Sequence, residues 1–433
     1  MQVQRKVASI ISSAYPGFCS GLTNIAKHWF LIFIFIKSWA TVTGGRNYNA
    51  TAAQSTFRCR HFPTSMHPKY FIILLSLILL NHLSFGQYNT ISKINTSAGE
   101  QYFNIVDILQ ANKVPVASDW ETLFKTTVYQ MMISGNAIDT LELKSSMIKV
   151  FMPSSIPLSI SDLSSKERYH LAYKTNQTQL KVYIDFLKIT NVIDSVKALL
   201  YPFLPKHFQT TALFPTLFYL NYGSAEATGY GGVVINDLLH SYKIDKYKFG
   251  LLAAHEAFHS IVSVGFQKAL KQDINYNAPD FNLLYFLQNM SEEGIADLID
   301  KPLLSQKSSP VYDEVKVLVE NDELLSIMYI EKLDSLLKLA STSEQTLNQY
   351  QSFTILAKAY GQNGGHIPGR FIGWVINEGG LLKRHILSVE DPVSFIITYN
   401  DAVKTLGNKY PVFSKESIAY LIELKTRYWQ TIK

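Results

Sequence analysis

The chain has 433 residues, of which 47% are hydrophobic and 17% charged, and it contains two cysteines. This composition excludes an intrinsically disordered chain and a disulfide framework. The formal charge of +6 would suit a nucleic acid partner, but residues 1–86 carry eight Lys and Arg and no Asp or Glu. Subtracting these eight charges leaves −2 for residues 87–433, so we expect no nucleic acid to bind the protein.

Residues 66–86 have the order of regions typical of an export signal. A short basic start is followed by an apolar run over residues 70–80, and the small residues Ser84 and Gly86 precede the expected cleavage site. The apolar run is shorter than the roughly 20 residues that span a bilayer. We therefore predict a signal peptide that is cleaved before Gln87; the alternatives are a membrane anchor or a buried core helix.

The residues upstream of this signal are expected to have no role in the working protein. We predict that residues 1–65 are translated from an upstream start codon, and that residues 87–433 form one large domain. This domain would be exported to the periplasm, the cell envelope or the medium, with no stable membrane span and no cysteine; its oligomeric state stays open. N-terminal sequencing of the natural protein should begin at Gln87, and protein that retains residue 30 would contradict this prediction.

Residues 87–433 have a mostly helical pattern. A capping box at Ser118 predicts a helix that extends to about Ile133. Two short apolar segments, residues 212–220 and 230–236, are β-like and indicate a hairpin or a small piece of sheet. The fold class expected is mainly α with a small β element (α+β). Apolar spacing predicts the remaining helices over residues 179–200, 245–271, 280–300, 312–339, 346–360, 368–378, 391–406 and 415–429.

Residues 255–259 have the sequence HEAFH, in the middle of the helix predicted over residues 245–271. His255 and His259 are four residues apart, so they lie one turn apart on the same face of that helix. Two imidazoles so placed can bind one tetrahedral zinc ion. Glu256 is poorly placed as a ligand, but it can reach a water on the metal and act as general base. The alternative is an amphipathic helix with two polar residues on its wet face.

A third metal ligand is expected on the following helix. One class of such sites places a Gly and a His three and six residues after the second histidine, where this chain has Val262 and Gly265, so that class is excluded. Another class uses a Glu from a second helix, and Glu293 follows His259 by 34 residues. Asp297, one turn after Glu293, can accept the outer N–H of a ligand histidine.

Glu292 is a competing candidate for this third ligand. The residue one turn after Glu292 is Ala296, which has no carboxylate to orient a histidine, so Glu293 is favoured. Gly294 and Ala296 are small, and we expect them to let the two helices approach closely.

This pattern resembles that of the gluzincins, the thermolysin-like branch of zinc metallopeptidases, in which HExxH is followed by ExxxD on a second helix. More narrowly, the chain resembles secreted bacterial zinc-dependent peptidases of unknown function. The specific resemblance covers about residues 210–380. It implies a zincin-like fold, with the HExxH helix packed against the ExxxD helix. It also implies that zinc is held by His255, His259 and Glu293. In the same resemblance Glu256 is the general base, and Asp297 is the carboxylate behind a ligand histidine.

The resemblance further implies a strand beside the metal that binds the substrate backbone, for which residues 230–236 are the candidate. The spacing between the second histidine and the glutamate is longer than in thermolysin. The extra residues are rich in Asp, Asn and Pro between residues 273 and 279, which predicts a loop.

A Gly-rich segment, residues 360–370, is the best source of a group that stabilises the negatively charged oxygen of the reaction. Tyr360, His366 and Arg370 are its candidates, because Pro368 suits the first turn of a helix and a helix N-terminus favours an anion. The alternative is an ordinary loop with polar residues. Trp374 is interpreted as core, and four isolated histidines as surface or capping residues: His170, His207, His240 and His385.

The function predicted is that of an exported zinc metallopeptidase acting on peptide or protein substrates. One rival is a secreted binding protein on an inactive zincin scaffold, against which the intact Glu256 argues, since a purely structural site needs no base. The other rival is a zinc hydrolase of a non-peptide amide or ester, which shares the same metal chemistry.

Overall fold

The computed structural model describes residues 93–430, apart from 154–158, 222–226, 314, 317–321 and 362. The predicted signal peptide and residues 1–65 lie outside the described residues. In the described part, helices predominate and four strands form one sheet, which confirms the expected fold class of mainly α with a small β element. None of the described helices combines the length and the apolar character that a bilayer span requires.

The first group of helices comes before the HExxH sequence in the chain. The helix predicted from Ser118 begins one residue earlier, where the Asp119 carboxylate accepts the N–H of Val116, and it ends at Phe124. The helix predicted over residues 179–200 is two helices, because the Asn191 side chain caps the second. The group comprises α4 (Ser97–Gln110), α5 (Ala117–Phe124), α6 (Thr127–Ser134), α7 (Thr140–Phe151), α8 (Ser165–Thr175), α9 (Gln177–Ile189), α10 (Val192–Leu200) and α11 (Leu238–Asp245), with short 3-10 turns Ile160–Asp162, Tyr201–Phe203 and Lys206–Phe208.

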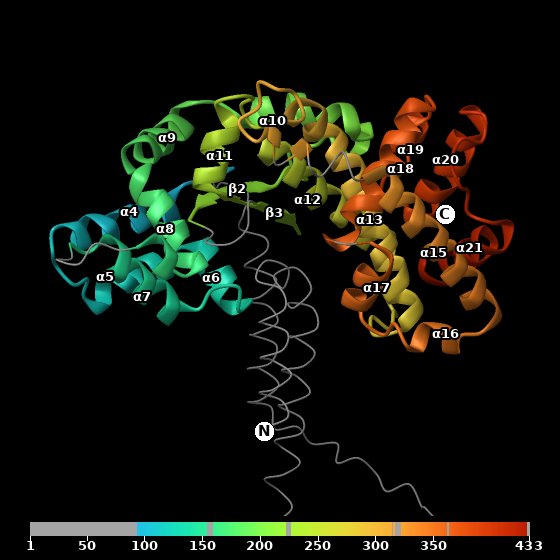
Figure 1. Ribbon diagram of the computed structural model, residues 1–433, viewed down its shortest axis with the longest axis horizontal. Coiled ribbons are helices and arrows are strands. Elements are labelled where there is room, and N and C mark those ends of the chain that lie inside the picture. The colour runs from blue at the N-terminus through green and yellow to red at the C-terminus, as the bar shows by residue number, and fades with distance from the viewer. Residues whose placement is uncertain are drawn as a thin grey trace, which may run out of the picture. The chain divides into compact units, whose positions relative to one another are not determined.

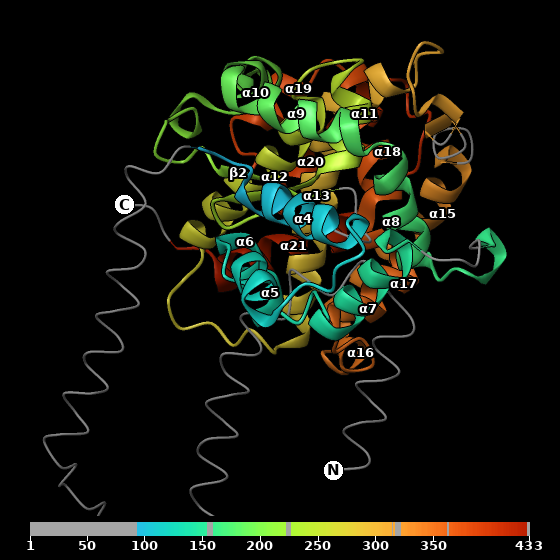
Figure 2. The ribbon, with the colours of Figure 1, turned by 90° about the vertical axis from the view of Figure 1, so that its left-hand side faces the viewer.

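The sheet has the strand order β1-β2-β4-β3, where β1 is Ile94–Asn95, β2 is Thr216–Leu220, β3 is Ala227–Tyr230 and β4 is Val233–Asp237. β2 is parallel to both β1 and β4, and β3 is antiparallel to β4. Helix α4 packs against β2, as Figure 2 shows. A hairpin between residues 212–220 and 230–236 is therefore wrong, because β2 and β4 are parallel, whereas the alternative of a small piece of sheet is confirmed. β1 and β3 are the edge strands of the described sheet.

The HExxH sequence lies in α12 (Leu251–Ala269), and the ExxxD sequence lies in α13 (Pro279–Leu304). Helix α12 contacts β3 and β4 on one side and α13 on another, and α13 in turn contacts the C-terminal helices (Figure 1). These are α15 (Asp322–Thr342), α16 (Gln345–Asn348), α17 (Phe353–Tyr360), α18 (His366–Glu378), α19 (Leu382–Ile386), α20 (Pro392–Thr405) and α21 (Lys415–Tyr428), with a 3-10 turn at Asn363–Gly365. The two motif helices thus lie between the sheet and the C-terminal helices.

Strand β3 passes directly over the part of α12 that contains the HExxH sequence. A methyl group on Gly229 would lie 1.8 Å from the carbonyl oxygen of Glu256, so only glycine permits this approach. The candidate for the substrate-binding strand, residues 230–236, consists mostly of β4, which has β2 on one side and β3 on the other. β4 therefore has no unpaired edge for a further strand, whereas β3 lies at an edge of the described sheet.

Helices α13 and α18 cross with their backbones in contact. A methyl group on Gly369 would lie 2.2 Å from the carbonyl oxygen of Met290, and one on Gly373 would lie 2.1 Å from that of Gly294. Gly294 therefore brings α18 close to α13. We expected it to face α12, which contacts α13 at other residues. This crossing fixes the start of α18, at His366, beside Glu293.

Replacing Gly369 with Ala is expected to lower the free energy of unfolding by about 1–3 kcal/mol, because the added methyl group forces the two helices apart. Thermal or urea unfolding followed by circular dichroism measures the change. Asn377→Ala, on the exposed side of the same helix, is the control and should leave stability nearly unchanged. Wild-type stability in Gly369→Ala would show that the crossing is looser than described.

Two of the four isolated histidines are buried. His170 is 2% exposed and its Nδ1 lies 2.8 Å from the hydroxyl of Tyr102, and His385 is fully buried against the ring of Phe395. The interpretation of these two as surface or capping residues is therefore wrong, whereas His207 is exposed. No hydrogen bond within the described residues reaches either ring nitrogen of His385.

Replacing His385 with Leu is expected to remove part of the acid sensitivity of the fold. Burial lowers the pKa of His385 to about 3, from 6.5 in the unfolded chain, so between these values only the unfolded state binds the proton. Stability is then lost as the pH falls below 6.5, by about 2 kcal/mol at pH 5. Urea unfolding at pH 5 and pH 7.5 measures this difference. It should shrink in His385→Leu but persist in the control His207→Leu, and an equal difference in all three proteins would refute the prediction.

Candidate metal centre

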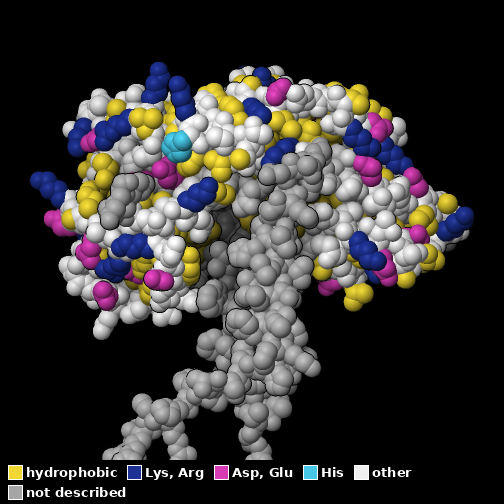
Figure 3. Space-filling view, turned by 180° about the vertical axis from the view of Figure 1, so that it is seen from behind, with side chains coloured by type: hydrophobic (Ala, Val, Ile, Leu, Met, Phe, Trp, Pro, Cys, Tyr) yellow, Lys and Arg dark blue, Asp and Glu magenta, His cyan; other side chains and the backbone are white. Residues whose placement is uncertain are grey.

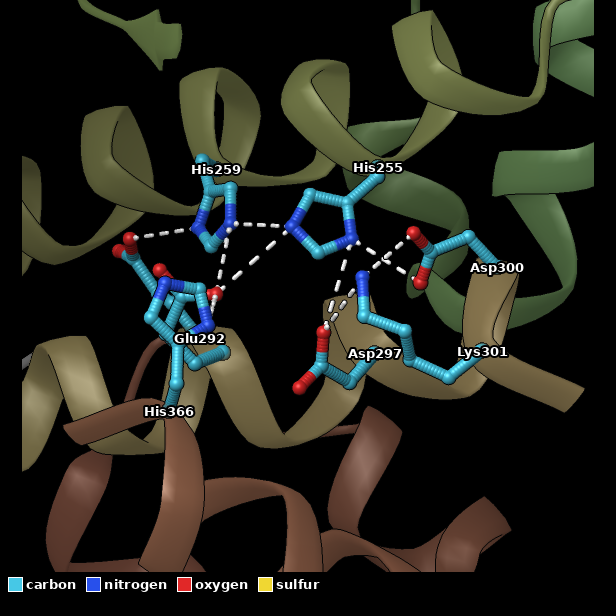
Figure 4. A network of polar contacts seen from close by, with 8 residues as sticks. His255, His259, Glu292, Asp297, Asp300, Lys301 and His366 are labelled. Atoms are coloured by element: carbon cyan, nitrogen blue, oxygen red, sulfur yellow. Dashed lines mark hydrogen bonds and ion pairs between the residues drawn. The ribbon is translucent and has the colours of Figure 1, made fainter. Parts of the chain in front are cut away.

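His255 and His259 are buried, at 5% and 8% exposure, on the side of α12 that faces α13. Nearly every side of α12 is covered, so its two histidines do not lie on a wet face as the amphipathic alternative requires. Their Nε2 atoms lie 3.2 Å apart and point toward each other (Figure 4). Two buried imidazoles with facing nitrogen atoms need a third partner between them.

Glu293 supplies a carboxylate oxygen to the same point. Its Oε2 lies 3.7 Å from Nε2 of His255 and 3.4 Å from Nε2 of His259. Ligand atoms held at about 2.0–2.1 Å from a tetrahedral zinc ion lie about 3.4 Å apart. The three atoms therefore have the mutual spacing of three zinc ligands, which fits the donor set that zinc prefers.

The Oε2 atom of Glu293 is buried and accepts no hydrogen bond from the described residues, although imidazole nitrogen atoms surround it. A cation would satisfy it. The charge of the surroundings also favours a cation. The basic side chains here are Lys301 and Arg370, and the five carboxylates are Glu256, Glu292, Glu293, Asp297 and Asp300. With neutral histidines and ionised carboxylates, the described cluster carries an excess of three negative charges, which a divalent cation would reduce.

Two carboxylates lie behind His255. The Oδ1 atom of Asp300 is 3.3 Å from Nδ1 of His255, and that of Asp297 is 3.9 Å away. Lys301 pairs with both, at 2.8 Å from Asp300 and 3.3 Å from Asp297 (Figure 4). Sequence reasoning missed Asp300, although it is seven residues after Glu293 and so two turns further along the same face of the helix.

Glu292 lies behind His259. Its Oε2 is 3.4 Å from Nδ1 of His259, and its Oε1 accepts a hydrogen bond of 2.7 Å from the side chain of Gln288. The residue considered as a competing ligand therefore faces the outer nitrogen of a histidine, on the opposite side of the ring from Glu293.

His366, the first residue of α18, reaches the same carboxylate from a third element. Its Nδ1 lies 2.9 Å from Oε2 of Glu293, and its side chain is 37% exposed. The crossing of α13 and α18 makes this approach possible. Of the three groups predicted in the Gly-rich segment, His366 is the one that the structure brings to Glu293.

Tyr360 and Arg370 lie elsewhere. The hydroxyl of Tyr360 donates to that of Tyr350 at 3.2 Å, and both line a pocket of 540 Å³ on α15 and α17. Arg370, one turn after His366, lines a different pocket of 360 Å³ together with Asp297. The structure thus places Arg370 one helical turn after His366 and directs Tyr360 toward Tyr350.

The second pocket is mostly apolar. Its other lining residues include Leu298, Pro302, Phe371 and Trp374, from α13 and α18. Trp374 is 38% exposed, so its interpretation as a core residue is wrong. Sequence periodicity could not show this, because the exposure of Trp374 depends on how α18 packs against its neighbours.

The electrostatics of the cluster favour positive charge at the imidazoles. Burial lowers the pKa of His255, but Asp300 and Glu293 raise it more, to about 10. Burial raises the pKa of Glu293, but the charges of His366 and His259 lower it well below its ordinary range. Protons and a metal ion compete for such nitrogen atoms, so the field that holds protons here would also hold a divalent cation.

Comparison with known proteins points to the same chemistry. The model of a family described as "Putative zinc dependent peptidase (DUF5700)" matches residues 120–408. The chain belongs to this family. The DUF5700 match contains α12, α13 and α18, and therefore Glu293 and the three histidines that surround its Oε2. No curated protein and no solved structure matches the chain.

Proposed function

We propose that this DUF5700 protein is an exported zinc metallopeptidase whose ion is held by His255, His259 and Glu293. The observation that carries the proposal is the mutual spacing of 3.2–3.7 Å between Nε2 of His255, Nε2 of His259 and Oε2 of Glu293, a buried oxygen that accepts no hydrogen bond from the described residues. The packing of an HExxH helix against an ExxxD helix, beside an antiparallel edge strand, supports a gluzincin-like site.

Zinc held there would polarise the scissile carbonyl and lower the pKa of a water molecule. Glu256 accepts a proton from the attacking water and passes it to the leaving amine nitrogen. Burial raises the pKa of Glu256, which makes its protonated form a ready donor in the second step. His366, partly exposed beside Glu293, donates a ring N–H to the oxygen that gains negative charge.

Strand β3 is the part of the sheet that we expect to bind the substrate backbone. It lies at the edge of the described sheet, and Gly229 brings it against the backbone of Glu256. An extended peptide that pairs with this edge as a further strand would pass beside the general base.

The pocket that Arg370 and Asp297 share supports a place for a substrate side chain. It lies one turn beyond His366 on α18 and one turn beyond Glu293 on α13. Because Phe371, Trp374 and Leu298 line it, an apolar side chain next to the scissile bond is the group that it would accept.

A peptide or protein is the proposed substrate, and we propose no nucleic acid partner. On the face shown in Figure 3, the Lys and Arg side chains of the described residues are interspersed with Asp and Glu. A nucleic acid site requires clustered positive charge.

The decisive experiment incubates the purified protein with a diverse peptide mixture and identifies products by mass spectrometry. Cleavage that stops when a chelator removes the metal, and returns with zinc, supports the proposal. Zinc binding without any cleavage would favour the binding protein or the hydrolase of a non-peptide amide or ester. Absence of bound zinc would refute the metal centre itself.

A further inference from the structure

We propose that each imidazole of the candidate metal centre has its own buried orienting carboxylate, Asp300 for His255 and Glu292 for His259. Asp297, the carboxylate that the ExxxD pattern assigns to this task, has a different place. The inference rests on the zinc site proposed above, but not on the substrate that the site acts on.

The geometry around His255 favours Asp300 over Asp297. The Oδ1 atom of Asp300 is 0.6 Å nearer to Nδ1 of His255, at 3.3 Å against 3.9 Å. Asp300 is itself held in place, because Lys301 contacts its other oxygen at 2.8 Å. Both Nδ1 of His255 and Oδ1 of Asp300 are buried without another hydrogen-bond partner in the described residues, so each is the obvious partner of the other.

Asp297 faces another part of the centre. One of its carboxylate oxygens lies within 4.8 Å of the ligand atoms of both Glu293 and His366, and the residue also lines the pocket that contains Arg370. Asp297 thus lies between Glu293 and the pocket, where its charge can attract the basic side chains of Lys301 and His366. It is the more distant of the two carboxylates behind His255.

Glu292 stands in the same relation to His259. It is 6% exposed and lies beside another carboxylate, Glu293, so its burial is unfavourable unless its charge is used. Oε2 lies 3.4 Å from Nδ1 of His259, and the Gln288 amide holds Oε1 at 2.7 Å. Gln288 is 1% exposed and one turn earlier on α13, so it fixes the rotamer of Glu292.

The two pairs produce the same result on both rings. A carboxylate at Nδ1 keeps the proton on that atom, which leaves the lone pair of Nε2 directed at Oε2 of Glu293 and at the ion. It also makes the imidazole a stronger donor to the metal. Asp300 and Glu292 are therefore positioning residues, since they act on the metal through His255 and His259.

Chelator competition on the purified full chain measures the dissociation constant for zinc. We expect Asp300→Asn and Glu292→Gln each to weaken zinc binding by about 10–100-fold, and Asp297→Asn to weaken it less than either. The Co²⁺-substituted proteins provide a spectroscopic readout, because altered imidazole orientation shifts the absorption bands of the cobalt. An effect of Asp297→Asn as large as that of Asp300→Asn would overturn the assignment for His255.

Further variants separate orientation from folding. Asp300→Asn leaves Lys301 with one carboxylate fewer, so the double variant Asp300→Asn with Lys301→Met removes both charges. Zinc affinity should stay as low as in Asp300→Asn; recovery to the wild-type value would show that Asp300 acts through Lys301. Gln288→Met leaves Glu292 in place without its anchor and should weaken zinc binding by a smaller factor, whereas unchanged affinity in both Glu292→Gln and Gln288→Met would overturn the assignment for His259.

These measurements do not depend on peptide cleavage. A protein that binds zinc as expected, responds to Asp300→Asn and Glu292→Gln, and cleaves no peptide would refute the proposed function and leave this inference standing. A protein that cleaves peptides but whose zinc affinity is unchanged in both variants would support the proposed function and refute this inference.

Discussion

Replacing Glu256 with Gln is expected to lower kcat/KM for peptide hydrolysis by roughly 10²–10⁴-fold, the usual contribution of a general base. The amide cannot accept a proton from water, but it has almost the size of the carboxylate. Glu256 is not among the atoms that converge on Oε2 of Glu293, so zinc should remain bound at wild-type stoichiometry. Turnover assays and metal analysis of the same preparation measure both quantities.

A carboxylate that is exposed on a neighbouring element makes the matched control. Glu378 lies at the exposed end of α18, and Glu378→Gln should retain wild-type turnover and zinc. Full activity in Glu256→Gln would remove Glu256 from the mechanism. Loss of zinc from that variant would mean that Glu256 is itself a ligand, and the assignment of Glu293 would then need revision.

Replacing Glu293 with Ala is expected to abolish stable zinc binding, and activity with it. Three nitrogen atoms, from His255, His259 and His366, surround its Oε2 at 2.9–3.7 Å, so its loss removes the one anionic ligand of the set. Without that anion the site also loses part of the charge that attracts a divalent cation. Metal analysis after dialysis against a weak chelator measures the occupancy.

Glu292→Ala separates the two adjacent glutamates. If Glu293 is the ligand, Glu293→Ala should lose far more zinc than Glu292→Ala, which removes only the partner of the outer nitrogen of His259. The opposite order would make Glu292 the ligand. Wild-type zinc content in both variants would end the model of a His-His-Glu site.

The sequence could predict the local part of this centre because helix geometry is periodic. A spacing of four residues places His255 and His259 on one face, and the same rule relates Glu293 to Asp297. The same periodicity relates Glu293 to Asp300, seven residues and two turns later, so the sequence also contained the signal for Asp300. Which of two carboxylates on one helix face lies nearer to a histidine depends on the crossing of α12 and α13, and no spacing contains that information.

Features that depend on tertiary packing were less accessible. His366 is 107 residues after His259, so no local spacing connects the two. Tyr360 and Arg370 were equal candidates for the anion-stabilising group, because a Gly-rich segment alone does not show which side chain points inward. The edge strand β3 is only four residues long and includes Gly229, so its apolar pattern is weak. The helix break at Asn191 depends on one capping contact, and the break at Thr126 has one hydrogen bond from the Thr126 hydroxyl to the Leu123 carbonyl; periodicity shows neither contact.

The crossing of α13 and α18 divides the centre between two pieces of chain. His255, His259 and Glu293 come from consecutive helices joined by one loop, whereas His366 arrives from a helix that follows much later. Contacts between residues close in sequence form more readily during folding, because closing a long loop costs more entropy. The α12–α13 pair is therefore expected to be able to bind an ion before the C-terminal helices have packed against it. We therefore expect the proposed ligands to come together before His366 arrives, so that a partly folded chain would bind zinc without the group proposed to stabilise the negative charge of the reaction.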